Sequence, residues 1–266
     1  MPSRAAKAEI LRTLHHCPEV LVLPNAWDCA SARIFEEAGF PAIATTSAGV
    51  ANVLGYPDGQ RISRDEMLAV VTRIVRCVEI PVTADLEAGY DDAAKTAAAL
   101  VESGAVGLNL EEASGDPAKL VHTVSVVRRV GNELGVNIVI NARTDLYLDQ
   151  VGDPASRFDR ACERLRAYRD AGADCLFIPG VTDEETIRRF VEALRFPINI
   201  LATAGAPPIA RLRELGVARV TIGSGAARAV LGLTRQIAVE LKNEGTYDSM
   251  LRGAISYPEA NRLFEK

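Results

Sequence analysis

The stretch Ile80-Pro81-Val82-Thr83-Ala84-Asp85-Leu86-Glu87-Ala88-Gly89-Tyr90 joins a short β-prone run to two carboxylates and a glycine. Residues two apart on a strand point to the same side, so Asp85 and Glu87 would project together where the strand ends. Two like charges held together repel each other. A hard cation such as Mg²⁺ offsets that repulsion, because it binds a few carboxylate oxygens and keeps several waters. Two solvated acids at a loop edge are the alternative interpretation, and the surrounding sequence decides between them.

The same arrangement of an apolar run followed by a longer amphipathic segment repeats along the whole chain. Eight runs are strand-like, at residues 20–23, 42–45, 81–84, 106–110, 137–141, 175–178, 198–201 and 219–222. The segments between them have apolar residues at three- and four-residue spacing, which is typical of helices: 29–38, 64–77, 93–103, 117–134, 154–171, 184–194, 208–215 and 226–243. The strand-like runs are rich in Val, Ile and Leu, which indicates a parallel sheet covered by helices on both faces.

Eight β-α units in one chain predict an α/β fold of the (β/α)8 TIM-barrel type, as a single domain over residues 1–266. A doubly wound open sheet is the alternative, but such sheets usually carry a Gly-rich phosphate turn after their first strand. Here that place reads Leu23-Pro24-Asn25-Ala26-Trp27-Asp28. Residues 245–266 continue past the eighth unit, and we expect them to form a helical extension that packs on a partner subunit.

Composition excludes several classes of function. The 266 residues are 48% hydrophobic, and 30 basic and 35 acidic residues are mixed along the chain to a net charge of −5. The absence of a basic cluster argues against a nucleic-acid or membrane-surface partner. No apolar run reaches the roughly 18 residues that span a bilayer. The five cysteines are widely spaced without a C-x-x-C motif, so we expect reduced thiols in a cytoplasmic protein.

Polar groups concentrate at the carboxyl ends of the second to fifth expected strands, where barrels of this type place their active sites. A metal would need the acids, and an anionic substrate would need Arg143, whose planar fork binds carboxylates or phosphates through two bonds. The three histidines lie away from these ends, and we expect them to be surface or helix residues. The strand-end residues are Thr45, Thr46, Ser47, Asp85, Glu87, Glu111, Glu112, Asn141, Arg143 and Asp145.

Five motifs run in a fixed order through about residues 20–240: Thr46-Ser47-Ala48-Gly49-Val50-Ala51, Leu54-Gly55-Tyr56-Pro57-Asp58, Asp85-Leu86-Glu87-Ala88-Gly89-Tyr90, Gly107-Leu108-Asn109-Leu110-Glu111-Glu112 and Asn141-Ala142-Arg143-Thr144-Asp145. In this order they resemble the isocitrate lyase and phosphoenolpyruvate mutase superfamily. The resemblance implies a barrel that binds Mg²⁺, or Mn²⁺, and a small 2-oxo or 2-hydroxy acid. It also implies a homotetramer whose C-terminal helices exchange between subunits.

The resemblance assigns expected roles residue by residue. The metal ligands would be Asp85, Glu87 (in place of a second aspartate) and Glu111. The substrate-binding residues would be Thr45, Ser47, Ala48, Gly49, Asp85 and Arg143. The catalytic residues would be Asp58, Arg143 and Glu111, with Asp58 an acid near the reacting group.

The chain departs from the family pattern on one side of the expected pocket. The lyases carry a Lys-Lys/Arg-Cys-Gly-His loop after strand four, where this chain reads Glu112-Ala113-Ser114-Gly115-Asp116-Pro117-Ala118-Lys119. A glutamate and an asparagine of the lyases align with Pro179 and near Leu201. Isocitrate lyase activity is therefore not expected.

The resulting hypothesis is a Mg²⁺-dependent lyase or decarboxylase that cleaves a C–C or P–C bond through an enolate-like intermediate. Its substrate would be a small 2-oxo or 2-hydroxy dicarboxylate or a phosphonate, with oxaloacetate-like acids the first choice. Two alternatives remain open at this point. One is an aldolase-type enzyme acting on pyruvate enolate, and the other is a 2-oxo-acid binding protein without turnover.

Overall fold

A computed structural model describes residues 2–112 and 115–265 of the chain. Nine short strands form one all-parallel sheet in the order β1-β9-β8-β7-β6-β5-β4-β3-β2. The strands are β1 (Leu21–Leu23), β2 (Asn25–Ala26), β3 (Ile43–Thr45), β4 (Val82–Asp85), β5 (Gly107–Leu110), β6 (Val139–Arg143), β7 (Cys175–Phe177), β8 (Ile198–Leu201) and β9 (Arg219–Thr221).

The sheet closes on itself through the segment around Pro24. β1 pairs with β9 on one side, and β2 pairs with β3 on the other, while Pro24 alone separates the two pieces. Pro24 has no N–H group to donate to a neighbouring strand. The expected first strand at 20–23 therefore ends before it as β1, and the short strand β2 that follows was not expected. The result is the expected TIM-type barrel rather than a doubly wound sheet.

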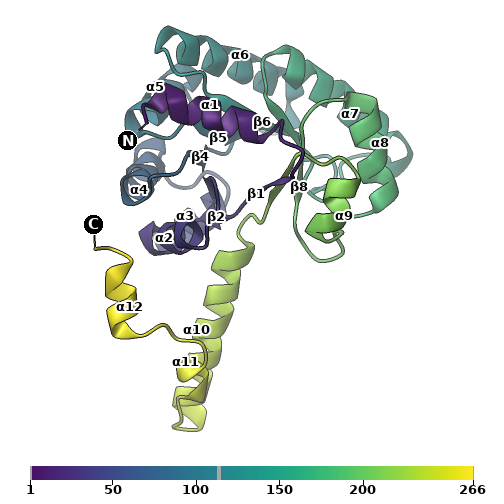
Figure 1. The fold of residues 1–266 in the computed structure, drawn as a ribbon. Helices are drawn as coiled ribbons and strands as arrows, with labels where there is room; N and C mark the ends of the chain where they lie inside the picture. The colour runs from purple at the N-terminus through teal and green to yellow at the C-terminus, as the bar shows by residue number, and fades with distance from the viewer. Residues whose placement is uncertain (1, 113–114, 266) are drawn as a thin grey trace.

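Helices follow the strands and surround the barrel (Figure 1). The long ones fall where the periodicity predicts them. The helices are α1 (Arg4–Leu14), α2 (Cys29–Glu37), α3 (Ser47–Val53), α4 (Arg64–Cys77), α5 (Ala93–Ser103), α6 (Pro117–Glu133), α7 (Pro154–Asp170), α8 (Glu184–Leu194), α9 (Ile209–Glu214), α10 (Gly225–Asn243), α11 (Asp248–Leu251) and α12 (Tyr257–Arg262). No helix within the described residues is both long and apolar enough to cross a bilayer.

Helix α1 packs against the end of the barrel at which the strands begin. Its Leu11 is fully buried, and a Cβ placed on Gly107 would lie 2.9 Å from the Leu11 side chain and 2.9 Å from the Thr83 hydroxyl. Only glycine therefore fits at the first position of β5. His15, which follows α1, is 3% exposed and its Nδ1 lies 2.8 Å from the Leu11 carbonyl oxygen. His15 was expected to be a surface or helix residue, and it is the C-cap residue of α1 but is buried rather than on the surface.

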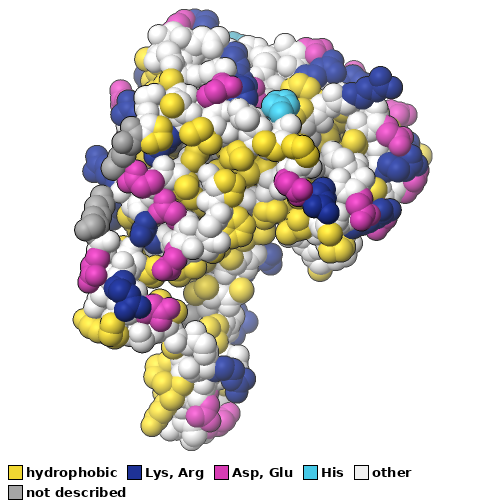
Figure 2. Space-filling model, viewed as in Figure 1, with side chains coloured by type: hydrophobic (Ala, Val, Ile, Leu, Met, Phe, Trp, Pro, Cys, Tyr) yellow, Lys and Arg dark blue, Asp and Glu magenta, His cyan; other side chains and the backbone are white. Residues whose placement is uncertain are grey.

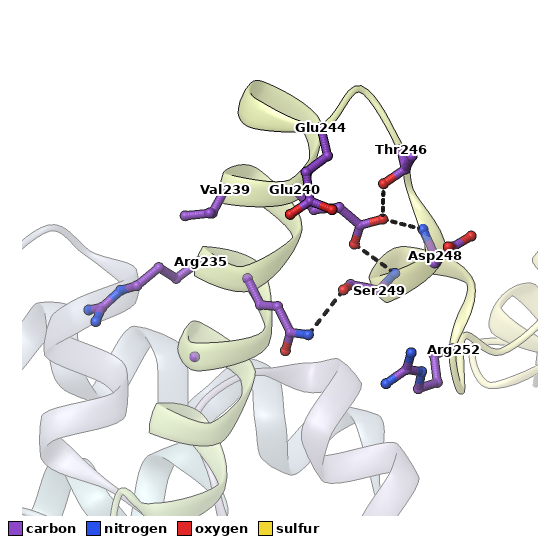
Figure 3. A pocket seen from close by; sticks show the side chains of 10 residues that line it. Arg235, Val239, Glu240, Glu244, Thr246, Asp248, Ser249 and Arg252 are labelled. Carbon is purple, nitrogen blue, oxygen red and sulfur yellow. Dashed lines mark hydrogen bonds between the residues drawn. The ribbon is translucent and has the colours of Figure 1, made fainter.

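Helix α10 leaves the barrel as an arm, and the chain turns back through α11 to α12 (Figure 1). The Glu240 carboxylate holds the turn, because it accepts hydrogen bonds from the Thr246 hydroxyl at 2.7 Å and from the N–H groups of Asp248 and Ser249 at 2.6 and 2.9 Å (Figure 3). A hollow of about 490 Å³ lies beside these residues. Near the C-terminus, the Leu263 carbonyl accepts a hydrogen bond from Arg33 Nε of α2 at 2.6 Å.

Candidate active site

Asp85 ends strand β4 and is bound by residues of the neighbouring strand end. One of its carboxylate oxygens accepts hydrogen bonds from the Ser47 N–H at 2.9 Å and the Ser47 hydroxyl at 2.8 Å. The Asp85 N–H donates to the Thr45 hydroxyl oxygen at 2.9 Å. The contacts link strand β3, the start of α3 and strand β4. The expected residues Thr45, Ser47 and Asp85 therefore meet at one place, and the Asp85 carboxylate is fixed in orientation before any ligand arrives.

Glu87 lies just beyond β4 in a strained turn. Its backbone has a φ of 52°, in the left-handed region that costs non-glycine residues energy. The residue is 3% exposed, and its Oε1 is buried without a hydrogen-bond partner. Burial, together with the charges of Asp85 and Asp58, raises the pKa of Glu87 to about 7. Such a buried oxygen without a donor is suited to a cation or a proton.

Arg143 ends strand β6 and forms ion pairs with two carboxylates. Its Nη1 lies 2.6 Å from Glu111 Oε2, and its Nε lies 2.6 Å from Asp145 Oδ1. Burial alone would lower the Arg143 pKa, but Glu111, Asp145 and Asp85 raise it above the ordinary value. Burial raises the pKa of Glu111 to about 8 although the Arg143 charge opposes that change. The pKa values of Glu87 and Glu111 therefore both lie near neutral pH.

The remaining expected residues lie around this cluster. Asp58 is on an exposed loop, where its carboxylate accepts the Gly59 N–H at 3.0 Å, and its charge acts on Glu87. Ala48 and Gly49 lie in the first turn of α3. A Cβ on Gly49 would lie 2.9 Å from Trp27 Cβ, so glycine lets α3 approach strand β2.

The ends of the later strands are apolar beside this charged cluster. The Phe177 ring centroid at the end of β7 lies 6.0 Å from Arg143 Cζ. Pro179 and Leu201 stand at the positions where the resemblance leads one to expect polar groups. Of the loop that replaces the lyase motif, positions 113 and 114 lie outside the described residues.

The contacts of Glu112 and Arg219 differ from anything that the sequence predicted. Glu112 turns away from Glu111, with its side chain 1% exposed, and pairs with Arg164 Nη1 at 2.5 Å and with the Tyr168 hydroxyl. It ties strand β5 to α7 rather than joining the acids of the site. Arg219 is fully buried inside the barrel. A charged residue inside the apolar run 219–222 is a signal that could have singled it out.

The donor set suits a hard cation. Carboxylate oxygens are the ligands that Mg²⁺ prefers, and Glu87 Oε1 is a buried oxygen without a donor. No group of three or more potential ligand side chains is preassembled around one point within residues 2–112 and 115–265. A cation held by Asp85, with Glu87 and Glu111 reached through water, fits this arrangement, because Mg²⁺ keeps most of its waters.

A parallel barrel with carboxylates and an arginine at the carboxyl ends of its strands defines an enzyme of the TIM-barrel type. The family model for phosphoenolpyruvate phosphomutase matches residues 11–242. The chain belongs to this family, within the phosphoenolpyruvate mutase and isocitrate lyase superfamily. Members of the superfamily cleave C–C or P–C bonds.

Relatives are found among both curated proteins and solved structures. An uncharacterized protein of Mycobacterium tuberculosis is 38% identical over 217 residues, covering 79% of this chain and 80% of the relative. The 2-methylisocitrate lyase of Escherichia coli K12 is 30% identical over 240 residues, covering 83% and 79%. The crystal structure of a candidate lyase/mutase from Burkholderia cenocepacia J2315 has a TM-score of 0.91 and 36% identity, covering 99% and 97%.

Proposed function

We propose that this protein is a Mg²⁺-dependent lyase that cleaves a C–C or P–C bond in a small 2-oxo or 2-hydroxy acid. The proposed substrate is a dicarboxylate or a phosphonate, and Mn²⁺ is the alternative metal. Cleavage would pass through an enolate-like intermediate. The observation that carries the proposal is that Asp85, Glu87 and Glu111 lie close enough for their charges to interact, with Glu111 paired to Arg143. The lyases and mutases among the relatives support the reaction class.

Each charged side chain of the site has a separate role in the proposed reaction. Arg143 would hold the substrate carboxylate and stabilise negative charge as the enolate forms, while Glu111 and Asp145 keep its guanidinium oriented. A bound divalent cation would supply Lewis acidity at the oxo oxygen. Glu111 and Glu87, with pKa values of about 8 and about 7, can hold or release a proton at neutral pH. Asp58 would approach the reacting group from its loop.

The proposal is tested by turnover assays with and without MgCl₂ on oxaloacetate, phosphonopyruvate and 2-methylmalate. We expect product formation from at least one acid, and EDTA should abolish it. Release of pyruvate from a 4-hydroxy-2-oxo acid alone would favour the aldolase-type alternative. Calorimetric binding of 2-oxo acids without any turnover would identify a binding protein and contradict the lyase proposal.

We also propose that the arm formed by α10 and α11 packs against other copies of the chain, in a tetramer. The supporting observation is that α10 carries large apolar side chains in solvent, among them Leu231 (53% exposed) and Leu241 (49% exposed). Tyr257 of α12 is 82% exposed. Apolar side chains lie along the arm in Figure 2. Contiguous exposed apolar surface of this kind is typical of a protein–protein interface.

A further inference from the structure

Arg219 is the largest side chain that is fully buried in the described part of the chain. It begins strand β9, where it pairs in register with Leu21 of β1 and Asn199 of β8. Arginine is almost never fully buried unless a carboxylate or other group compensates its charge. Its place inside the barrel therefore calls for a physical explanation.

The contacts of Arg219 are to amides rather than to acids. Its Nη2 donates to Asn109 Oδ1 at 3.1 Å, and Asn141 Nδ2 donates to the same oxygen at 2.9 Å. Its Nε and Nη1 have no hydrogen-bond partner, and no ion pair to Arg219 occurs among residues 2–112 and 115–265. Burial lowers the pKa of Arg219 to about 10, which still leaves it protonated at neutral pH.

Cys175 and Asp85 are the groups whose charges would favour the Arg219 guanidinium, but burial raises the pKa of the Cys175 thiol to about 12, so it is uncharged at neutral pH. Asn109, which Arg219 binds, is the register partner of Asp85 on the adjacent strand. Asp85 is also the carboxylate whose charge acts on the Arg219 guanidinium. Asn109 thus binds Arg219 through its side chain and lies beside Asp85 through the pairing of β5 with β4.

A buried cation would balance part of the negative charge at the carboxyl ends of the strands. Five acids gather there, and its arginine, Arg143, is already paired with two of them. Above about pH 8, where Glu87 and Glu111 are both ionised, this excess of negative charge attracts a divalent cation but repels an anionic substrate. A fixed positive charge beneath the acids would reduce that repulsion without occupying space in the pocket. The five acids are Asp58, Asp85, Glu87, Glu111 and Asp145.

We propose that Arg219 is a positioning residue: a buried countercharge beneath Asp85, held by Asn109, that lets the acidic site accept an anionic ligand together with a metal. The inference rests on the proposed function, because it concerns how the same site binds its two charged ligands. It differs from a purely structural role in one respect. Loss of the Arg219 charge should change the affinities for cation and anion in opposite directions.

The experiment uses the full chain and four variants. Arg219→Gln and Arg219→Met both lose the charge, and they differ in that Gln is polar and Met apolar, so one neutral variant remains if the other fails to fold. Arg219→Lys keeps the charge. Arg128→Met is the matched control, because Arg128 pairs with Asp174 at 2.5 Å on the opposite end of the barrel, where α1 also binds Asp174.

Calorimetry at pH 8.5 would measure the Kd for Mg²⁺, and then the Kd for oxalate at a fixed free Mg²⁺ concentration. For the neutral variants we expect Mg²⁺ to bind at least about tenfold more tightly and oxalate at least about tenfold more weakly, because each ligand carries two charges that interact with the charge of Arg219. Arg219→Lys should stay within about twofold of the wild type for both ligands. Arg128→Met should change neither affinity.

The outcomes separate the inference from the function on which it rests. If the wild type binds neither Mg²⁺ nor oxalate, the proposed function and the role of Arg219 both fail. If the wild type binds both but the neutral variants weaken both, Arg219 is only structural and the inference alone is overturned. Unchanged affinities in the neutral variants would overturn it as well.

Discussion

Asp85 is the residue at which the geometry of the site converges. Two bonds from Ser47 fix one of its oxygens, and its N–H is fixed by Thr45. A carboxylate held in this way needs little reorganisation to bind a cation. The neighbouring Glu87 is held in a strained turn with an unpartnered oxygen, and such strain is often found at functional sites.

Replacement of Asp85 tests the metal site directly. Asp85→Ala removes the carboxylate that Ser47 orients, so we expect Mg²⁺-dependent oxalate binding to fall at least about a hundredfold, as for the loss of a group central to a metal site. Calorimetry measures this loss. Asp91→Ala is the control, since Asp91 is exposed on the same segment and should behave as the wild type. Unchanged affinity in Asp85→Ala would refute the site assignment.

The raised pKa values of Glu87 and Glu111 predict how stability depends on pH. Each carboxyl has an ordinary value of 4.5 and rises to about 7 or about 8 in the folded protein, so the native state holds more protons than the unfolded chain. The stabilisation is complete below about pH 4.5 and is lost as the pH rises through about 7 to 8.

Urea denaturation of the metal-free protein from pH 5 to pH 8.5 measures this dependence. The contribution of Glu87 and Glu111 to the free energy of unfolding should fall across that range, and saturating Mg²⁺ should restore stability at the alkaline end. In Glu87→Gln the fall should be shallower, because one of the two protons is no longer released. An identical pH profile for Glu87→Gln would show that Glu87 does not titrate in this range.

At the scale of elements, the connection between β5 and α7 supports the site from outside. Glu112 follows Glu111 directly, yet its carboxylate binds Arg164 and the buried Tyr168 hydroxyl on α7. Side chains of adjacent residues in an extended segment point to opposite sides. Glu112 thus anchors the strand end, so that Glu111 can face Arg143.

Breaking this anchor should cost stability. Glu112→Ala leaves Arg164 without its partner in a largely buried place, and we expect the free energy of unfolding to fall by about 3 kcal/mol. Chemical denaturation followed by circular dichroism measures the loss. Glu163→Ala, an exposed change on the same helix, should lie within about 0.5 kcal/mol of the wild type. A loss below 1 kcal/mol in Glu112→Ala would show that the pair is not an anchor.

At the scale of the whole molecule, the arm formed by α10 and α11 extends away from the barrel. Helix α10 exposes apolar side chains along its length, while Glu240 and its hydrogen bonds give the end of the arm a defined shape (Figure 3). In the same chain, Leu263 is buried and its carbonyl binds Arg33 of α2. A second copy covering the arm would remove this apolar surface from water.

Sedimentation analysis tests the assembly. We expect the wild type to sediment as a tetramer, and Leu231→Glu to shift it toward smaller species at micromolar concentration, because a charge would be buried in the contact. Lys242→Glu, an exposed change on the same helix, should leave the distribution unchanged. A monomeric wild type would contradict the proposal.

The sequence by itself determined the barrel and the order of the strand-end residues. Alternation of apolar runs and amphipathic segments is a local property, so it can be recognised without the tertiary structure. The same holds for the acids Asp85 and Glu111, because each directly ends or follows a strand. Ser47 was placed at the site, but its bonds to Asp85, 38 residues away, were beyond sequence reasoning.

Only the tertiary structure decided which charges face one another. In the structure Glu112 binds α7 and Arg143 pairs with two carboxylates. His15 is buried, and Arg219 lies inside the barrel without an acid as partner. These outcomes depend on contacts between residues far apart in the chain and on the loss of water around them, which no local pattern records. The stretch from Ile80 to Tyr90 thus identified the acids, whereas closure of the barrel determined their neighbours and therefore their pKa values.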